Sequence, residues 1–215
     1  MMALCRSLIH FNSPPLQRIN TATPLLPSRP RTLRKIAALS FPAPLSSISS
    51  SLSSMDSPPE GYRRNVGICL ISPSKKIFAA SRLDIPDAWQ MPQGGIDEDE
   101  DPRSAASREL REETGVTSAY VVAEAPHWLT YDFPPEVREK LKQQWNSDWK
   151  GQAQKWFLLK FTGEDKEVNL LGDGTEKAEF GQWSWMSPQE IVDHAVEFKK
   201  PVYLKVLENF SRYLQ

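Results

Sequence analysis

The stretch GGIDEDEDPRSAASRELREETGV, residues 94–116, decides the fold of this chain. A glycine pair and an acidic turn are followed by Asp101 and Pro102. These predict a helix start, because Asp caps free backbone N–H groups and Pro suits the first helical position. Gly115 predicts the helix end, since glycine readily adopts the left-handed conformation that closes helices. The stretch therefore predicts a loop, a helix running to about Thr114, and a second loop.

Three carboxylates share one face of this predicted helix. Glu109, Glu112 and Glu113 stand at i, i+3 and i+4, which places their side chains beside one another. Like charges so arranged repel by about 0.2–0.5 kcal/mol per pair, and a cation between them reverses the sign. Hard divalent ions such as Mg²⁺ prefer oxygen ligands and are often shared with substrate phosphates. The spacing favours a metal site, and the alternative is an ordinary solvated acidic face.

Elements on both sides of this helix indicate a layered fold. Before it, apolar runs at 66–71 and 77–81 predict strands, whereas the Pro and Gly residues of 84–95 favour a loop. Residues 155–161 are apolar enough to predict a central strand covered on both faces. The other predicted strands are 116–122, 128–132 and 182–186, and the other predicted helices are 136–144, 188–195 and 202–213. Strands interspersed with helices predict an α/β or α+β domain.

Charge divides the chain into two unequal parts. Of its 215 residues, 1–55 contain no Asp, Glu or Gly, but six basic residues, 11 Ser and 7 of the 18 Pro. This composition predicts a disordered transit peptide for the chloroplast or, alternatively, the mitochondrion, and sets 56–215 apart as the folded domain. That domain carries 20 basic and 27 acidic residues, a formal charge of −7.

Composition also excludes several classes of protein. No apolar run approaches the roughly 18 residues that a membrane helix needs, so no membrane role is expected. Cys5 and Cys69 are too few for a disulfide framework. The acidic domain argues against a protein that holds nucleic acid by bulk charge. No feature of the sequence implies an obligate protein partner.

Spacing over the whole stretch carries a more specific signal. It matches the pattern G-x5-E-x7-R-E-U-x-E-E-x-G-U, where U is a bulky apolar residue, at all nine fixed positions: Gly94, Glu100, Arg108, Glu109, Leu110, Glu112, Glu113, Gly115 and Val116. The stretch resembles the Nudix box, and the chain resembles a Nudix hydrolase. The resemblance implies a Nudix α/β/α sandwich with a mixed sheet and a catalytic loop–helix–loop. It also implies cleavage of a nucleoside diphosphate linked to another group, with Mg²⁺ or Mn²⁺ as cofactor.

The resemblance assigns roles by position. Arg108 and Glu100 belong to the implied catalytic set because their pairing braces the loop. Water is expected to attack one phosphorus in line with the departing phosphate, at a site where metal ions neutralise phosphate charge. The general base stays unassigned. The implied metal ligands are Glu109, Glu112, Glu113, the Gly94 carbonyl and Glu179, of which the first three are also the implied catalytic carboxylates.

The resemblance extends beyond the box. It is carried by GYRRNVG (61–67), WQMPQGG (89–95), WLTYDFP (128–134), GQAQKWF (151–157) and EF (179–180). These segments are similar to plant asymmetrical diadenosine tetraphosphate hydrolases, which implies cleavage of diadenosine tetraphosphate into ATP and AMP. They are also similar to bacterial RNA 5′-pyrophosphohydrolases, so triphosphorylated RNA 5′ ends stay an alternative substrate.

Several residues are candidates for binding such a substrate. Cationic donors suit a phosphate chain, aromatic faces accept purines, and amides can hydrogen-bond phosphate or ribose. The candidates are Arg63, Arg82 and Lys155 for phosphates, Tyr131 for a purine, and Gln93 and Gln154 for hydrogen bonds, with Lys199 or Lys200 as a further cation. For Arg82 the alternative is a solvated surface position, and for Tyr131 it is a place in the core.

Asp99 departs from the family pattern, because relatives often have glycine at this point of the loop. Glycine there would supply a positive φ at little steric cost. The substitution bears on the conformation of the loop 96–100, and through it on the preference for substrate.

Overall fold

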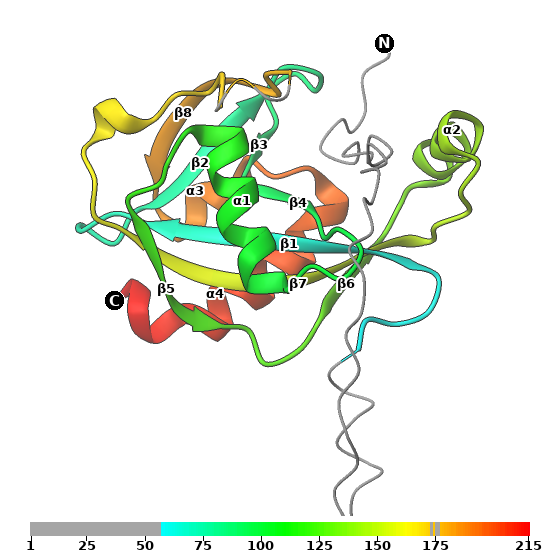
Figure 1. Ribbon diagram of the computed structural model, residues 1–215, viewed down its shortest axis with the longest axis horizontal. Coiled ribbons are helices and arrows are strands. Elements are labelled where there is room, and N and C mark those ends of the chain that lie inside the picture. Colours follow the sequence, from blue (N-terminus) through cyan, green and yellow to red (C-terminus); the bar gives the residue numbers. More distant parts are fainter. Residues whose placement is uncertain (1–56, 173, 175–176) are drawn as a thin grey trace, which may run out of the picture.

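The computed structural model of the protein describes residues 57–172, 174 and 177–215 (Figure 1). The transit peptide expected over 1–55 lies outside these residues. Within them, no helix is both long and apolar enough to cross a membrane.

A mixed eight-stranded sheet forms the middle of the molecule. Its centre is the parallel pair β1 (Tyr62–Ile71) and β7 (Gly151–Phe161), and every other strand pair is antiparallel. The main path runs β3-β2-β1-β7-β5, while β4 pairs with β1, β6 with β7 and β8 with β2. The remaining strands are β2 (Ile77–Arg82), β3 (Trp89–Gln90), β4 (Gln93–Gly95), β5 (Ala119–Glu124), β6 (Leu129–Asp132) and β8 (Phe180–Met186).

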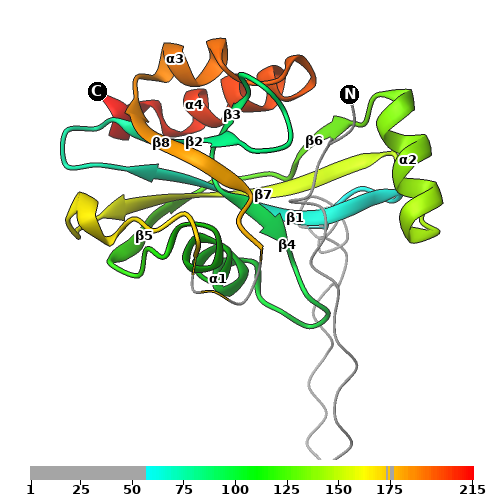
Figure 2. The same ribbon diagram turned by 90° about the horizontal axis from the view of Figure 1, so that it is seen from above.

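Helices cover both faces of this sheet, as Figure 2 shows from above. One face carries α1 (Pro102–Thr114), and the other carries α3 (Pro188–Asp193) and α4 (Lys200–Leu214). A fourth helix, α2 (Pro135–Trp145), extends beyond the end of the sheet where β6 and β7 meet. Short 3₁₀ turns lie at Asp165–Glu167 and Glu197–Lys199. The architecture is therefore the expected α/β/α sandwich.

Alternation along β1 feeds a separate core on each face. Val66, Ile68 and Leu70 pack with the α1 face, whereas Cys69 and Ile71 pack with the α4 face. Between them, Gly67 lies so close to the buried Trp156 ring that a Cβ there would come within 2.4 Å of its Cε2. The absence of a side chain at residue 67 therefore leaves the space that the buried Trp156 ring occupies beside the central strand.

Local sequence signals located most elements, and tertiary pairing explains the differences. The helices expected at 102–114 and 136–144 are confirmed as α1 and α2, and 155–161 is part of the buried strand β7. The loop expected over 84–95 was wrong in its second half, because Trp89–Gln90 pairs with β2 as β3 and Gln93–Gly95 pairs with β1 as β4. The strand expected at 116–122 begins at Ala119 instead, as β5.

Candidate active site

Both ends of α1 are fixed by the residues that predicted them. The Asp101 carboxylate accepts a hydrogen bond from the Ser104 N–H at 3.0 Å, and Pro102 occupies the first helical position. At the other end Gly115 adopts φ 70° and donates its N–H to the Arg111 carbonyl at 2.8 Å. In the loop before the helix, Asp99 itself adopts the left-handed conformation, with φ 63°. Asp99 thus occupies the conformation that glycine would have supplied.

Strand β4 lies directly against the carboxylates of α1. Gly94 leaves space for the fully buried Glu109 side chain, since a Cβ on Gly94 would lie 1.9 Å from its Cδ. The next contact is made by Gln93, whose N–H donates to Glu113 Oε2 at 3.0 Å. Backbone pairing of β4 with β1 therefore positions two of the three helix carboxylates.

Repulsion among buried acids marks this site electrostatically. Burial raises the pKa of Glu113 well above its usual range, and repulsion from Glu179 and Glu109 raises it further, against the Gln93 hydrogen bond. Glu179 immediately precedes β8, and its Oε2 lies 2.9 Å from Nη1 of Arg82. The fold thus brings Glu179, the expected ligand from outside α1, close to the helix carboxylates. A cation at this place would relieve their repulsion.

Arg108 braces the loop that precedes α1. Its guanidinium donates to both Glu100 oxygens, at 2.9 and 2.8 Å, and to the Gly95 carbonyl at 2.8 Å. The hydrogen bond from Arg108 lowers the pKa of the Glu100 carboxyl. The same guanidinium reaches Glu109 Oε1 at 2.9 Å and Glu112 Oε2 at 3.0 Å. Arg108 therefore both anchors the loop and supplies positive charge between two expected ligands.

The donor set fits a hard divalent cation, although the side chains are not gathered around one. The oxygens of Glu109, Glu112, Glu113 and Glu179 are the ligand type that Mg²⁺ and Mn²⁺ take. Yet among residues 57–172, 174 and 177–215 no three acidic, His or Cys side chains converge as a metal site. The Arg108 contacts account for this arrangement, because they turn two carboxylates toward the guanidinium.

A second polar cluster lies on the α4 face of the sheet, across β4 from the carboxylates. Its members are nine-tenths or more buried, and hydrogen bonds join them into one network. Gln154 Nε2 donates to Asn65 Oδ1 at 2.8 Å, and Lys199 donates to the side-chain oxygens of Gln90 and Gln93. We call it the amide cluster, and its members are Asn65, Gln90, Gln93, Gln152, Gln154 and Lys199.

The amide cluster has spare donors. The side-chain nitrogens of Asn65, Gln90 and Gln152 are buried and have no hydrogen-bond partner among the described residues. By contrast, the side-chain oxygens of all four glutamines accept at least one hydrogen bond. Unpaired buried donors are costly, so the cluster is suited to a ligand rich in acceptor atoms.

Two aromatic rings border this cluster. Tyr131 and Phe198 lie with ring centroids 5.6 Å apart, and the Tyr131 hydroxyl donates to Gln152 Oε1. Tyr131 is only 5% exposed and belongs to the core on the α4 face. Lys199 Nζ lies 5.8 Å from the centroid of the same ring. The core position considered for Tyr131 is therefore found, and its ring also adjoins the donors.

The expected substrate residues lie on both faces of the sheet. Gln93, Tyr131 and Gln154 meet at the amide cluster, and Arg63 lies against Gly95 on the side of β4 that faces away from Glu109, where a Cβ on Gly95 would come within 2.6 Å of its Nη2. Lys155 points to the opposite face, where its Nζ lies 2.8 Å from Glu124, because neighbouring residues on a strand alternate.

Arg82 occupies a third environment. It is buried rather than solvated, so the surface alternative was wrong. Its guanidinium donates to both Asp84 oxygens at 2.7 Å and to Glu179. Arg82 therefore connects β2 to Glu179 of the acidic site.

Sequence reasoning missed Asn65, Gln90, Gln152 and Phe198. One signal was available for the glutamines. Gln152 and Gln154 share one face of β7 with Trp156. A buried strand with polar side chains at every second residue indicates a polar functional site on that face. Phe198 comes from a 3₁₀ turn before α4, where no local pattern distinguishes it.

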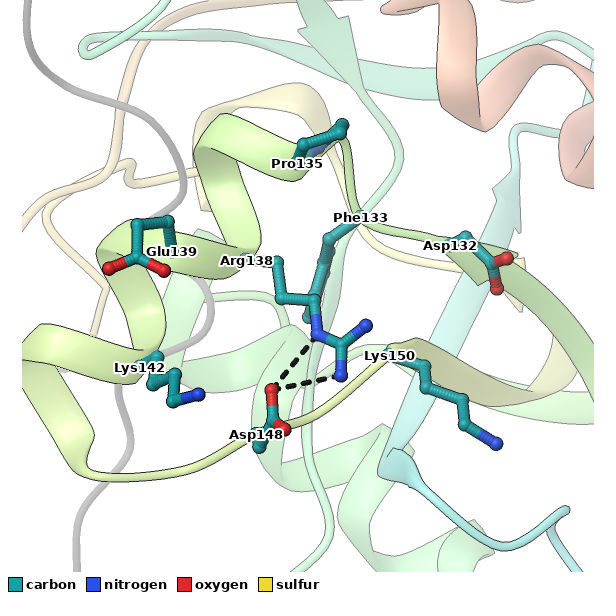
Figure 3. A pocket seen from close by; sticks show the side chains of 8 residues that line it. All are labelled: Asp132, Phe133, Pro135, Arg138, Glu139, Lys142, Asp148 and Lys150. Atoms are coloured by element: carbon teal, nitrogen blue, oxygen red, sulfur yellow. Dashed lines mark hydrogen bonds and ion pairs between the residues drawn. The ribbon is translucent and has the colours of Figure 1, made fainter.

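Hollows also lie elsewhere on the surface of the described residues. Figure 3 shows one of about 500 Å³ beside α2, where Arg138 Nε donates to Asp148 at 3.0 Å. Another, of about 600 Å³, is lined by Lys155, Trp128 and Arg64. The hollow that Glu112, Glu113 and Glu179 line together holds only about 10 Å³.

Comparison with known proteins agrees with this geometry. Residues 61–209 match the NUDIX domain family. The chain is 64% identical over 220 residues to Nudix hydrolase 26, chloroplastic, of Arabidopsis thaliana, with 100% of both chains covered. It is 51% identical over 156 residues to an RNA pyrophosphohydrolase of Cereibacter sphaeroides, which covers 71% of this chain and 93% of that one.

A solved structure shows the same fold at low sequence identity. The E. coli dihydroneopterin triphosphate pyrophosphohydrolase gives a TM-score of 0.55 at 16% identity, over 69% of this chain and 98% of that one. The domain match spans both the carboxylate helix and the amide cluster, and the 64% relative covers the whole chain. The protein therefore belongs to the Nudix family and is a Nudix hydrolase.

Proposed function

We propose that the protein hydrolyses dinucleoside polyphosphates in the presence of a divalent metal, and that it cleaves diadenosine tetraphosphate asymmetrically into ATP and AMP. One observation carries the proposal: the acidic site and the amide cluster lie on either side of Gln93–Gly95. A nucleoside polyphosphate has the matching layout, with an aromatic base and an acceptor-rich phosphate chain in one molecule.

The α4 face would hold the nucleoside end. The half-buried Phe198 ring would offer a face on which a purine can stack, and the buried Tyr131 ring would pack against it. The spare amide nitrogens of Asn65, Gln90 and Gln152 would donate to acceptor atoms of the substrate, and Lys199 would add positive charge. Arg63, at the edge of Gly95, is placed to meet the phosphate chain as it crosses β4.

The carboxylates would hold the cofactor. We assign Mg²⁺ or Mn²⁺ to Glu109, Glu112, Glu113 and Glu179, with the Gly94 carbonyl as a further candidate ligand. A bound ion supplies charge neutralisation on the phosphates and a lowered pKa for water. Arg108 and Glu100 would hold the loop in place and take no direct part in the hydrolysis. Water adds to one phosphorus, the P–O bond to the departing phosphate breaks, and ATP and AMP leave.

RNA 5′-pyrophosphohydrolysis is the second candidate function. The 51% identity to a bacterial RNA pyrophosphohydrolase over 93% of its length favours it. The same ring pair could receive the first base of a transcript. The formal charge of −7 over residues 56–215 favours the smaller substrate, because long RNA is bound largely through phosphate neutralisation.

We also propose that the protein works in the chloroplast, with the mitochondrion as the alternative. The acid-free, Ser-rich leader supports import into an organelle. The relative at 64% identity carries the name chloroplastic. A fluorescent fusion of the full chain should accumulate in plastids and lose this location when residues 1–55 are removed.

One side-by-side assay tests the function. The full chain is incubated with Mg²⁺ and either diadenosine tetraphosphate or a triphosphorylated RNA, with Glu113→Gln as the test variant. Glu208→Gln, on the exposed side of α4, is the matched control. We expect ATP plus AMP as the favoured products, at wild-type rates in Glu208→Gln and strongly reduced rates in Glu113→Gln. Faster pyrophosphate release from RNA would support the second candidate.

A further inference from the structure

We propose that the turn Asn169–Gly172 is a positioning element for the metal-binding carboxylates. It fixes the last turn of α1, from which Glu112 and Glu113 project. The inference rests on the metal-binding role proposed above for these two residues. The turn lies in the connection from β7 to β8, which is the connection that also supplies Glu179.

The first contact of the turn is with the end of the helix. The last carbonyl groups of a helix have no partner within the helix. Here the Asn169 N–H donates to the carbonyl of Thr114 at 2.8 Å. Thr114 is the last residue of α1 and follows Glu113 directly. The C-cap residue adds a second contact, since a Cβ on Gly115 would lie 3.1 Å from the Asn169 Cβ.

The Asn169 side chain sets the shape of the turn. Its Oδ1 accepts from the Leu171 N–H at 3.1 Å, and its Nδ2 donates to the Gly172 carbonyl at 3.1 Å. The Gly172 N–H in turn donates to the Asn169 carbonyl at 2.8 Å. One side chain therefore determines where the backbone of residue 172 lies.

Gly172 then packs on the backbone of Glu112. A Cβ on Gly172 would lie 1.7 Å from the Glu112 carbonyl oxygen and 2.8 Å from its carbonyl carbon. Both atoms are main chain, so they cannot rotate away as the end of a flexible side chain could. Gly172 also has a φ of 64°, which disfavours any other residue. Any displacement of this turn is transmitted to the backbone that carries Glu112.

Such precision matters for a metal site. Ligands must be held within about 0.5 Å of their productive positions, and groups that only support them typically affect metal affinity by about 10–100-fold. The turn contacts the helix at Glu112, Thr114 and Gly115, which flank and include the expected ligands. Asn169 and Gly172 are accordingly positioning residues with no contact to substrate.

Gly172→Ala tests the proposal, and the same connection provides its control. Gly174 also has a positive φ, 82°, but a Cβ there meets nothing within 4 Å. Gly172→Ala and Gly174→Ala therefore share the backbone strain, and only the first displaces Glu112. Binding of Mn²⁺ alone to the full chain is measured by titration of the free-ion electron paramagnetic resonance signal. Asn169→Ala and Asn169→Asp form a second pair, in which Asp keeps the acceptor for the Leu171 N–H.

We expect Gly174→Ala to bind Mn²⁺ like the wild type and Gly172→Ala to bind it at least about 10-fold more weakly. Asn169→Ala should weaken binding too, and Asn169→Asp should restore part of it. Wild-type affinity in Gly172→Ala, or in Asn169→Ala if the first variant does not fold, would overturn the positioning role alone. Binding by the wild type that survives Glu113→Gln unchanged would instead overturn the metal assignment, and this proposal with it.

Discussion

The carboxylate of Glu109 lies where a side chain on Gly94 would have to be. Strand β4 thus contributes no side chain where it meets helix α1, and the buried Glu109 carboxylate fills that space at the centre of the acidic site. We expect Gly94→Ala to push Glu109 aside, to reduce hydrolysis by at least about 100-fold and to destabilise the fold by about 1–3 kcal/mol through overpacking. Steady-state hydrolysis and urea unfolding measure the two effects.

Gly181→Ala is the control for this prediction. Its Cβ would meet the flexible end of Leu83 at 3.1 Å, and otherwise Ser81 Oγ at 3.6 Å and Leu83 Cγ at 3.9 Å, which are ordinary contact distances. Activity within a few-fold of wild type is expected there. Equal losses in the two variants would show that the effect of residue 94 is general destabilisation rather than displacement of Glu109.

Asp99 adopts φ 63° in the loop before α1, a conformation that costs a residue with a Cβ about 1–2 kcal/mol and glycine very little. Replacing Asp99 by glycine removes this cost, but glycine loses more conformational entropy on folding, which offsets part of the benefit. We expect Asp99→Gly to raise the free energy of unfolding by up to about 1 kcal/mol. Glu98 does not have a positive φ, so Glu98→Gly should lower the free energy of unfolding. Chemical denaturation of both variants decides the point, and a loss of equal size in each would contradict the expectation.

Glu167 ties the chain after β7 to the start of β5. Burial opposes ionisation, but hydrogen bonds from the Thr117 and Ser118 N–H groups, at 2.7 and 2.8 Å, outweigh it and lower the pKa of Glu167. A lowered pKa in the folded state means stability that is present above the unfolded value of about 4.3 and is lost as pH falls through the folded value. Glu167→Gln should therefore destabilise the protein at pH 7 and much less near pH 3.

The size of this effect is modest, because Glu167 is largely reached by solvent. We expect roughly 0.5–1 kcal/mol at pH 7, after allowance for screening. Thermal unfolding across pH 3–7 measures it. Glu164→Gln, whose partner Lys166 is exposed, should show almost no difference at any pH. A penalty for Glu167→Gln that stays constant down to pH 3 would rule out the ionised carboxylate as its source.

Lys199 is 4% exposed and donates to two glutamines of the amide cluster. Lys199→Met removes the charge that we assign to substrate binding and should raise KM at least about 10-fold with a smaller change in kcat. It also leaves buried amide oxygens with fewer donors, at a cost of about 1–3 kcal/mol in stability. Lys200→Gln is the control, since Lys200 pairs with the exposed Glu197. An unchanged KM in Lys199→Met would exclude Lys199 from the substrate site.

Local signals were sufficient for the helix and its carboxylates. Asp101, Pro102 and Gly115 act within a few residues of themselves, so the sequence alone locates α1 and the face that Glu109 and Glu113 share. The strand β4 depends instead on pairing between Gln93–Gly95 and β1, which no local composition reveals. Gly94 and Gly95, which the sequence places in a loop, lie in this strand and pack closely against Glu109 and Arg63.

The amide cluster required the three-dimensional arrangement. Its residues come from β1, β3, β4, β7 and the turn before α4, and each alone looks like an ordinary polar residue. Alternation also separated Gln154 from Lys155, although the two were grouped as substrate candidates. Side-chain direction could be predicted from the strand period, but which face held the site could not.

Gln93 takes part in both halves of the molecule's chemistry. Its backbone N–H binds Glu113, while its side chain accepts from Gln154 and Lys199. A single residue therefore joins the cluster that we propose for substrate recognition to the carboxylates that we propose for metal binding. Under the proposed function, a substitution that moves Gln93 changes turnover as well as selectivity, because the backbone of the same residue holds Glu113.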